Sequence, residues 1–403
     1  MKKTGKLACC IILMLLPGLS LRALDVGLLL DQNANFTTDG IGVNSSQYEY
    51  SGTLIPRVSS LLGDTGEFIF SAGFSYQINP WVYMPELLRT EIALRFGLAE
   101  LTMGRMPYRD PLGIIAEGFF DGVLVSLDTG VGTLSAGGWY TGFLYKKRAA
   151  IAMTEDEVQS YYEELNYGDF MDTYFAPRRV LASLNWEHPS LGGFLDSKLA
   201  VLGQFDLGET NLNSQYVTAK IALPFRYFVF DMGGCFELTE YDDEFGTAMA
   251  AEMGFTWMLP TQLENHIILR GRFSSGVIED SPIEAFKPIT TIPQGNLLQA
   301  KLSGLSTISL SFLSRLHHAM STDLTASYFV RSDLGTFTYY PVDNPESNGY
   351  FLGAEIFWRF LWSITTGVQI NLGSGAFLPL FGDAAPHANT LWRFEAGVIL
   401  SFY

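Results

Sequence analysis

The sequence is poor in cysteine and in basic residues, and past residue 30 it contains no long apolar run. Its 25 Lys and Arg stand against 42 Asp and Glu, which gives a net charge of −17. An acidic chain without basic clusters cannot replace the counterions of phosphates, so we expect no nucleic-acid partner. No stretch after the N-terminal segment approaches the roughly 20 apolar residues of a membrane helix. Yet 48% of the residues are apolar and 14% are aromatic, which excludes a disordered chain.

The first residues have the order of a secretory signal peptide. Three lysines among the first six residues precede an apolar run from Leu7 to Leu21, and we expect cleavage after Ala23. The chain then divides into a signal peptide, 1–23, and a mature domain, 24–403. Removal of the signal peptide takes away four basic residues and no acidic one, which changes the net charge to −21. Cys235 is then the only cysteine, so no internal disulfide can form.

Apolar and polar residues alternate along the mature chain with a period of two, the pattern of strands with two unlike faces. The expected strands have roughly 9 to 17 residues, whereas those of ordinary sandwiches average about 5 or 6, and a tilted strand needs about 9 to 11 residues to cross a bilayer. We therefore expect membrane-spanning strands. Their ranges are about 24–36, 49–59, 66–78, 87–96, 98–106, 119–128, 131–142, 178–188, 194–208, 214–224, 226–239, 246–258, 261–275, 298–314, 320–332, 349–360, 361–374 and 391–402.

The connections between these eighteen strands alternate in length. Odd-numbered connections are usually long, such as 143–177 and 276–297, whereas even-numbered ones are tight, such as 129–130 and the Phe360-Leu361 junction. This asymmetry is typical of outer-membrane barrels, and only closure pairs both edge strands in lipid. The sequence predicts an all-β fold, a transmembrane antiparallel β-barrel of about 18 strands, with 16 as the alternative. Short turns would be periplasmic and long loops extracellular.

The chain ends inside its last expected strand, where alternating apolar residues lead to Phe402 and Tyr403. This ending resembles the C-terminal recognition strand of bacterial outer-membrane barrel proteins. The resemblance implies insertion by the barrel assembly machinery, contact with outer-membrane lipid, and a location in the cell outer membrane of a diderm bacterium. Aromatic residues near strand ends suit the interfacial girdles of such barrels, with buried core aromatics as the alternative; examples are Trp81, Trp257, Trp362 and Trp392.

A second resemblance covers residues 87–142. The succession Leu94-Arg95-Phe96-Gly97, Gly104-Arg105 and Phe120-Asp121-Gly122-Val123 is similar to the "GR" and "FDG" order of alginate-export-like and phosphate-porin-like barrels. It implies a barrel of 18 or 16 strands with a solute path through it. Strict alternation places Arg105 on the same side as Met103, so we do not assign Arg105 to the pore unless a bulge intervenes.

Many charged residues have inward parity on the expected strands. A polar lumen needs either water or charges that pair with one another, and both alternatives stay open. We expect an aqueous pore with a mixed to basic wall, and acidic outer loops such as 155–157 and 242–244. The predicted pore-lining residues are Arg89, Glu91, Arg95, Arg179, Glu187, Lys220, Glu252, Arg270, Arg272, Glu355, Arg359, Arg393 and Glu395.

The longest connection, 143–177, contains a short helix signal at Thr154 to Leu165, with Thr154 as N-cap and Glu157 completing a capping box. This loop either folds into the barrel and constricts it or lies over the mouth as a lid. The basic residues at 146–148 are pore-mouth guides, partners of lipid phosphates, or solvated surface charges.

No catalytic signature accompanies these patterns. The chain has five histidines, and His317-His318 lies in a predicted tight turn without acids at metal-ligand spacing. We expect no enzyme activity, no cofactor and no metal site. The sequence favours a porin-like channel for passive diffusion of small polar or anionic solutes. The alternative is a plugged surface barrel that acts as an adhesin or receptor through its acidic loops; the oligomeric state stays open.

Overall fold

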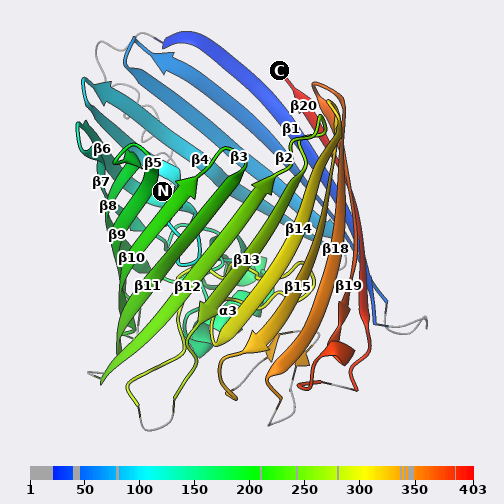
Figure 1. Ribbon diagram of the computed structural model, residues 1–403. Coiled ribbons are helices and arrows are strands. Elements are labelled where there is room, and N and C mark those ends of the chain that lie inside the picture. The colour runs from blue at the N-terminus through cyan, green and yellow to red at the C-terminus, as the bar shows by residue number, and fades with distance from the viewer. Residues whose placement is uncertain are drawn as a thin grey trace.

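The computed structural model shows one closed antiparallel barrel (Figure 1). It describes residues 21–39, 46–78, 81–208, 211–241, 244–278, 281–335, 338–339, 342–343, 349–385 and 387–403. Each strand pairs with the next along the chain, and the first pairs with the last, from Leu28 with Phe402 to Thr38 with Trp392. The predicted barrel of 18 strands is therefore confirmed, and the alternative of 16 is wrong.

The elements follow one another in a simple up-and-down order. The strands of the barrel are β1 Leu21–Thr38, β2 Gln47–Leu62, β3 Gly66–Ile78, β4 Val82–Phe96, β5 Ala99–Arg109, β6 Glu117–Thr129, β7 Gly132–Tyr140, β8 Arg179–Leu191, β9 Leu195–Asp206, β10 Asn213–Pro224, β11 Phe228–Tyr241, β12 Glu244–Met258, β13 His266–Ser274, β14 Leu305–His317, β15 Met320–Arg331, β18 Phe351–Thr365, β19 Val368–Leu378 and β20 Leu391–Phe402. The shorter elements are α2 Lys146–Ala149, α3 Glu155–Tyr162, η2 Tyr167–Asp169, α4 Phe170–Tyr174, β16 Thr338–Tyr339, β17 Val342–Asp343 and η3 Pro379–Phe381.

Several predicted strand limits are wrong. β18 continues through the expected Phe360-Leu361 turn to Thr365, because the real turn uses Thr366 and Gly367. β13 begins at His266 instead of 261, and β14 begins at Leu305 instead of 298. Within 298–304, the alternating apolar residues Leu298, Ala300 and Leu302 resemble one face of a strand, but they are buried inside the barrel. The connection predicted over 79–86 is also shorter, since β4 starts at Val82.

The outer face of the wall is apolar. On β10, exposed Val217 lies between the buried side chains of Tyr216 and Thr218, and on β12 exposed Met249 lies between buried Ala248 and Ala250. Other exposed apolar residues on the strands include Val123, Val125, Leu184, Val201, Phe236, Met253, Leu269, Ile308, Leu310, Leu324, Ile356 and Phe394. Each strand therefore turns an apolar row outward and a second row toward the lumen.

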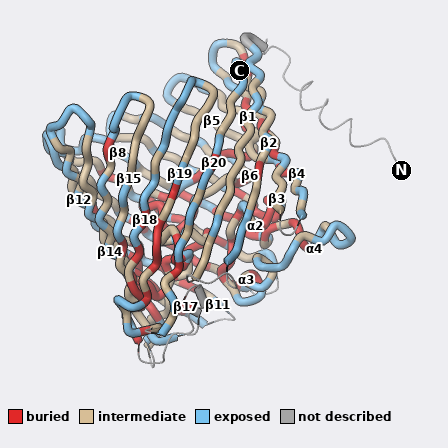
Figure 2. The backbone as a smooth tube through the Cα atoms, turned by 90° about the vertical axis from the view of Figure 1, so that its right-hand side faces the viewer, coloured by how far each residue is buried: buried red, intermediate tan, exposed pale blue. Residues whose placement is uncertain are grey.

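Long loops gather at one end of the barrel and tight turns at the other (Figure 1). Burial is concentrated in the half next to the long loops, where segments lie inside the ring of strands (Figure 2). No helix among the described residues is long and apolar enough to cross a membrane. Most of the predicted signal peptide, 1–20, lies outside the described residues, and β1 begins at Leu21, two residues before the expected cleavage site.

Candidate functional site

Three loops enter the lumen and bond to one another. They are 110–116 between β5 and β6, 141–178 between β7 and β8, and the described residues of 275–304 between β13 and β14. The amide of Ile289 donates to the carbonyl of Ile115 over 2.8 Å, and that of Thr291 to Ala150 over 2.7 Å. The ammonium of Lys301 donates to the carbonyl of Ala152 over 3.0 Å. The loops thus form one inner assembly.

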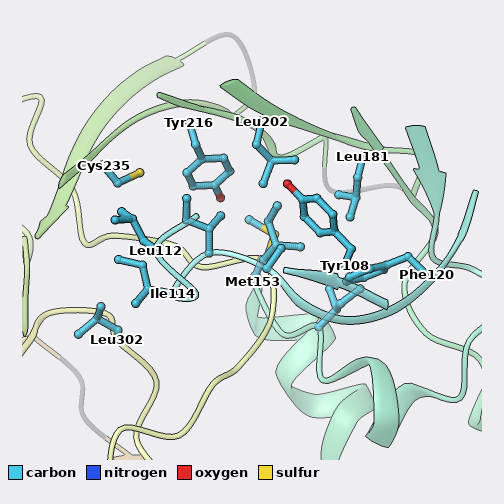
Figure 3. Close-up of a cluster of buried hydrophobic side chains, with 14 of the residues drawn as sticks. Tyr108, Leu112, Ile114, Phe120, Met153, Leu181, Leu202, Tyr216, Cys235 and Leu302 are labelled. Carbon is cyan, nitrogen blue, oxygen red and sulfur yellow. The ribbon is translucent and has the colours of Figure 1, made fainter. Parts of the chain in front are cut away.

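An apolar cluster fills the lumen on the side of β6 to β12 (Figure 3). Leu181, Leu202 and Tyr216 extend inward from the wall and meet Leu112 and Met153 of the loops (Figure 3). All five have at most 6% of their surface exposed. Cys235 is a buried member of the same cluster. This side of the lumen is therefore closed to water.

One carboxylate organises the first loop. Asp110 accepts backbone hydrogen bonds from Leu112, Gly113, Ile115 and Ala116 over 2.9 to 3.0 Å. Burial raises the pKa of Asp110, and the four hydrogen bonds oppose that shift. The arrangement holds the loop 110–116 in a tight bend that points its apolar side chains into the cluster. Sequence reasoning did not single out Asp110, because a lone Asp between two strands is an ordinary turn residue.

The second loop is held by a buried ion pair. Arg179 donates to the Glu157 carboxylate over 2.9 Å from Nε and 2.6 Å from Nη2, and to the carbonyl of Leu212 over 3.0 Å. Glu157 also completes the capping box with Thr154, as predicted from the sequence. Arg179 has no exposed surface. Its predicted place on the pore wall is wrong, since the charge is used to hold α3 inside the barrel.

Residues predicted to line the pore hold the third loop, 275–304, in place. Glu355 accepts hydrogen bonds from the amides of Asn296, Leu297 and Leu298 over 2.7 to 3.1 Å and is 2% exposed. Arg359 donates to the side-chain oxygen of Asn296, and Arg393 donates to its carbonyl over 3.2 Å. Glu355 therefore supports the loop, whereas the two arginines connect the loop to the wall.

Most of the other predicted residues form ion pairs, either within one strand or between strands. Glu252 lies 2.6 Å from Lys220 and 3.5 Å from Arg272, with Gly233 between the strands leaving room for the lysine. Charge pairing, the alternative left open by the sequence, is thus frequent on this wall. The further pairs are Arg89 with Glu91, Arg95 with Glu100, Glu187 with Lys198, and Arg393 with Glu395.

Exposure separates these pairs into two groups. The Arg95 side chain is 76% exposed and that of Glu187 is 48% exposed, and both lie at the end of the barrel with the tight turns. Glu91 and Glu252 are 9% and 2% exposed in their pairs, deep in the wall. On the inner face of the strands, Arg57, Arg270 and Arg359 have no ion pair among the described residues.

Two cavities with charged residues in their lining lie in the part of the lumen that this apolar cluster leaves open. One has a volume of about 750 Å³ and the other about 360 Å³. The first is lined by Asn33, Asn35, His266, Asp323, Arg359, Asn371, Arg393 and Glu395. The second is lined by Arg57, Arg89 and Arg148 together with Leu29, Ile55, Ile69 and Phe119. The structure therefore brings four predicted residues, Arg89, Arg359, Arg393 and Glu395, to open space.

Arg105 is a functional residue that strict alternation did not assign. It forms a bidentate pair with Asp121 over 2.8 and 2.6 Å and is 6% exposed. Gly104 before it has φ +114°, so the backbone departs from regular strand geometry at this position. The Gly-Arg dipeptide was the available signal in the sequence. Which way the Arg105 side chain points depends, however, on where the pairing of β5 with β4 ends, and the dipeptide does not show this.

No protein-family model matches this chain, and no curated protein matches it. Solved structures do match. Pseudomonas aeruginosa OccK2 (OpdF) is 11% identical with a TM-score of 0.63 over 94% of this chain and 97% of that chain, and OccK2 has also been solved in complex with glucuronate. The outer membrane protein opdK of Pseudomonas aeruginosa is 12% identical, with a TM-score of 0.59 over 96% and 100%. Acinetobacter baumannii OccAB1 is 9% identical, with a TM-score of 0.59 over 94% of this chain and 97% of that chain. At such low identity, the chain is shown to share their fold.

Proposed function

We propose that the protein is an outer-membrane channel for passive diffusion of small polar or anionic solutes. The observation that carries this function is that cavities with charged lining residues stay open in a lumen otherwise filled by two apolar clusters, one along β6 to β12 and one along β14 to β20. Solved barrels of this fold include a protein named as an outer membrane protein. The solute would pass through these cavities, which lie along β13 to β20 and β1 to β4.

The outer surface supports insertion in a bilayer. Apolar side chains cover the outward rows of the strands, and a closed barrel leaves no strand edge unpaired at its β1–β20 junction. The four tryptophans proposed as girdle residues are exposed and lie near strand ends: Trp81 62%, Trp257 38%, Trp362 36% and Trp392 43%. Aromatic residues with these positions suit the two membrane interfaces.

The proposed preference for anions rests on cations that have no ion pair among the described residues. Arg57, Arg270 and Arg359 have no ion pair within the described ranges, and two of them line the open cavities. Such cations can attract a carboxylate in a confined passage. OccK2, of the same fold, has been solved in complex with glucuronate, a carboxylated sugar.

Planar bilayer recordings test both claims. Steady ohmic steps are expected, with a reversal potential that indicates anion preference in a salt gradient. Arg359→Gln should move that potential toward cation preference, whereas Arg95→Gln, at the exposed rim, serves as the matched control and should not. Absence of any conductance from folded barrels would refute the channel and favour the adhesin or receptor alternative.

Three further expectations belong to the same proposal. Residues 1–23 act as a secretory signal peptide, and the C-terminal strand is the contact for the barrel assembly machinery. Loop 143–177 narrows the passage. The resemblance of residues 87–142 to alginate-export-like and phosphate-porin-like barrels stays a hypothesis. Mass spectrometry of the mature N-terminus tests the cleavage after Ala23.

A further inference from the structure

The wall of the barrel is interrupted between β4 and β5. Their pairing runs from Phe96 with Ala99 only to Thr90 with Arg105, although β4 extends outward to Val82 and β5 to Arg109. Both strands remain paired on their other sides, β4 with β3 up to Val82 and β5 with β6 up to Arg109. Residues 82–89 of β4 therefore face β5 without a strand partner, and we call this interval the seam.

The local sequence explains why the two strands separate. A Cβ on Gly104 would lie 2.0 Å from the carbonyl oxygen of Thr90, so the strands approach closely there and then diverge at its positive φ of +114°. The register of β3 with β4 shifts between Ser71 and Ala72, which bends β4 at the same level. Beyond this level, Pro107 on β5 has no N–H to donate to a partner strand.

Side chains take the place of the missing strand. The hydroxyl of Tyr174 donates to the carbonyl of Pro85 over 2.7 Å. Tyr167 donates to the carbonyl of Tyr83 and accepts from its amide over 3.1 Å. Arg105 donates to the carbonyl of Leu87. Three side chains thus satisfy backbone groups that a continuous barrel would satisfy with a ladder, and two of the three belong to the loop 141–178.

A cavity lies directly behind the seam. Phe119 of β6 lines the 360 Å³ cavity together with Ile69 of β3 and Arg89 at the inner end of the seam, so the cavity connects the two strands on either side of the interruption. Arg148 of the loop lines the same cavity and is bonded to Glu86 of the seam over 2.9 Å. This volume corresponds to about twelve waters at ~30 Å³ each. Its lining combines three cations with aliphatic and aromatic side chains.

The seam opens toward an apolar surface. Trp81 and Tyr83 are 62% and 60% exposed at the outer end of β4. Phe143 and Met171 of the loop are 64% and 70% exposed. Figure 2 places α4 at the edge of the barrel beside β3 and β4. In a membrane, this level corresponds to the interface and the outer leaflet, where aromatic residues gather.

We propose that the seam is a lateral port through which a single-chain amphiphile with an anionic head group exchanges between the outer leaflet and the cavity. The inference rests on the proposed membrane location. The head group would meet Arg57 and Arg148, and the chain would lie along Ile69 and Phe119. Tyr167 and Tyr174 close the port through hydrogen bonds from their side chains to the backbone of β4. These bonds can break without disturbing the pairing of any two strands.

The experiment uses proteoliposomes whose membrane contains dodecanoate with a photoactivatable diazirine. Labelled residues are mapped by mass spectrometry, and dodecanol with the same diazirine is the uncharged control. In a Cys235→Ala background, Tyr174→Cys and Pro85→Cys are bridged with a short bismaleimide to lock the port. A bridge between Val201→Cys and Val217→Cys, which pair across the continuous β9–β10 ladder, is the matched control.

Dodecanoate should label Ile69 and Phe119 in the unbridged protein and in the control bridge, and the Tyr174–Pro85 bridge should abolish this labelling. Arg57→Gln should lower the labelling of Ile69 and Phe119 about tenfold, because the head group loses one charge-assisted hydrogen bond. Labelling restricted to exposed Trp81 and Tyr83 in every variant, or cavity labelling unaffected by the bridge, would overturn the port.

Conductance of the same preparations separates the two proposals. The Tyr174–Pro85 bridge should leave the axial conductance in place. Loss of labelling with normal conductance supports the port alone, and labelling without any conductance refutes the channel but supports the port.

Discussion

Replacement of Arg179 by Gln tests how firmly the loop 141–178 is held inside the barrel. Gln cannot reach the Glu157 carboxylate, so a buried charge loses its partner. Breaking a buried ion pair costs about 3–5 kcal/mol. Because Glu157 keeps hydrogen bonds from the amides of Met153 and Thr154, we expect the lower end of this range. A cost of about 3 kcal/mol raises the undocked fraction of the loop about 100-fold.

Limited trypsin digestion measures this fraction. Lys146 is 2% exposed in the docked loop, so cleavage after it follows loop release when opening is faster than cleavage. The cleavage rate of Arg179→Gln should exceed the wild-type rate by about 100-fold. Arg178→Gln, an exposed neighbour, is the matched control and should change little. Equal cleavage rates for the two variants would refute the reasoning. A second refutation would be full additivity, in which the free-energy cost of the double variant equals the sum of the costs of Arg179→Gln and Glu157→Gln.

Three other changes test separate parts of the structure. Deletion of 146–172 should raise single-channel conductance if the loop constricts the passage, and unchanged conductance would show that it does not. Burial lowers the pKa of Lys301 in the loop 275–304, so the docked loop binds a proton less well than the free loop. Docking therefore becomes more favourable as the pH rises toward the ordinary pKa of lysine. Lys301→Met should abolish the resulting difference in the rate of loop proteolysis between about pH 8 and about pH 10. Gly104→Ala should destabilise the barrel by about 1–3 kcal/mol in urea titrations, whereas Gly130→Ala, with open space around it, should not.

The barrel could be predicted from the sequence because its signal is local. Alternation with period two marks each strand, and the predicted ranges 66–78 and 391–402 agree with β3 and β20 at both ends. The predictions failed where apolar residues serve another purpose. Leu298, Ala300 and Leu302 alternate with polar residues because they pack in the lumen, and Phe360-Leu361 interrupts the alternation without a turn.

The inner side of the wall could be predicted only in part, since parity states where a side chain points but not what it meets. Arg179 and Arg359 have the same inward parity, yet one is sealed beneath α3 and the other borders a cavity. The difference comes from loops more than 20 residues away in the chain. Asp110 and Arg105 were missed for a related reason, because their roles depend on a bend and on a break in strand pairing.

The pairing of charges indicates where water reaches the lumen. A charge in an apolar surrounding is costly unless an opposite charge and further hydrogen bonds accompany it, whereas water relieves this demand. Arg179 on the filled side has a carboxylate partner, and Lys220 shares Glu252 with Arg272. Arg57 and Arg359 line the open cavities without an ion pair among the described residues. The passage should therefore run off-centre through these cavities, so its conductance should be set by their narrow cross-section and not by the full width of an 18-stranded barrel.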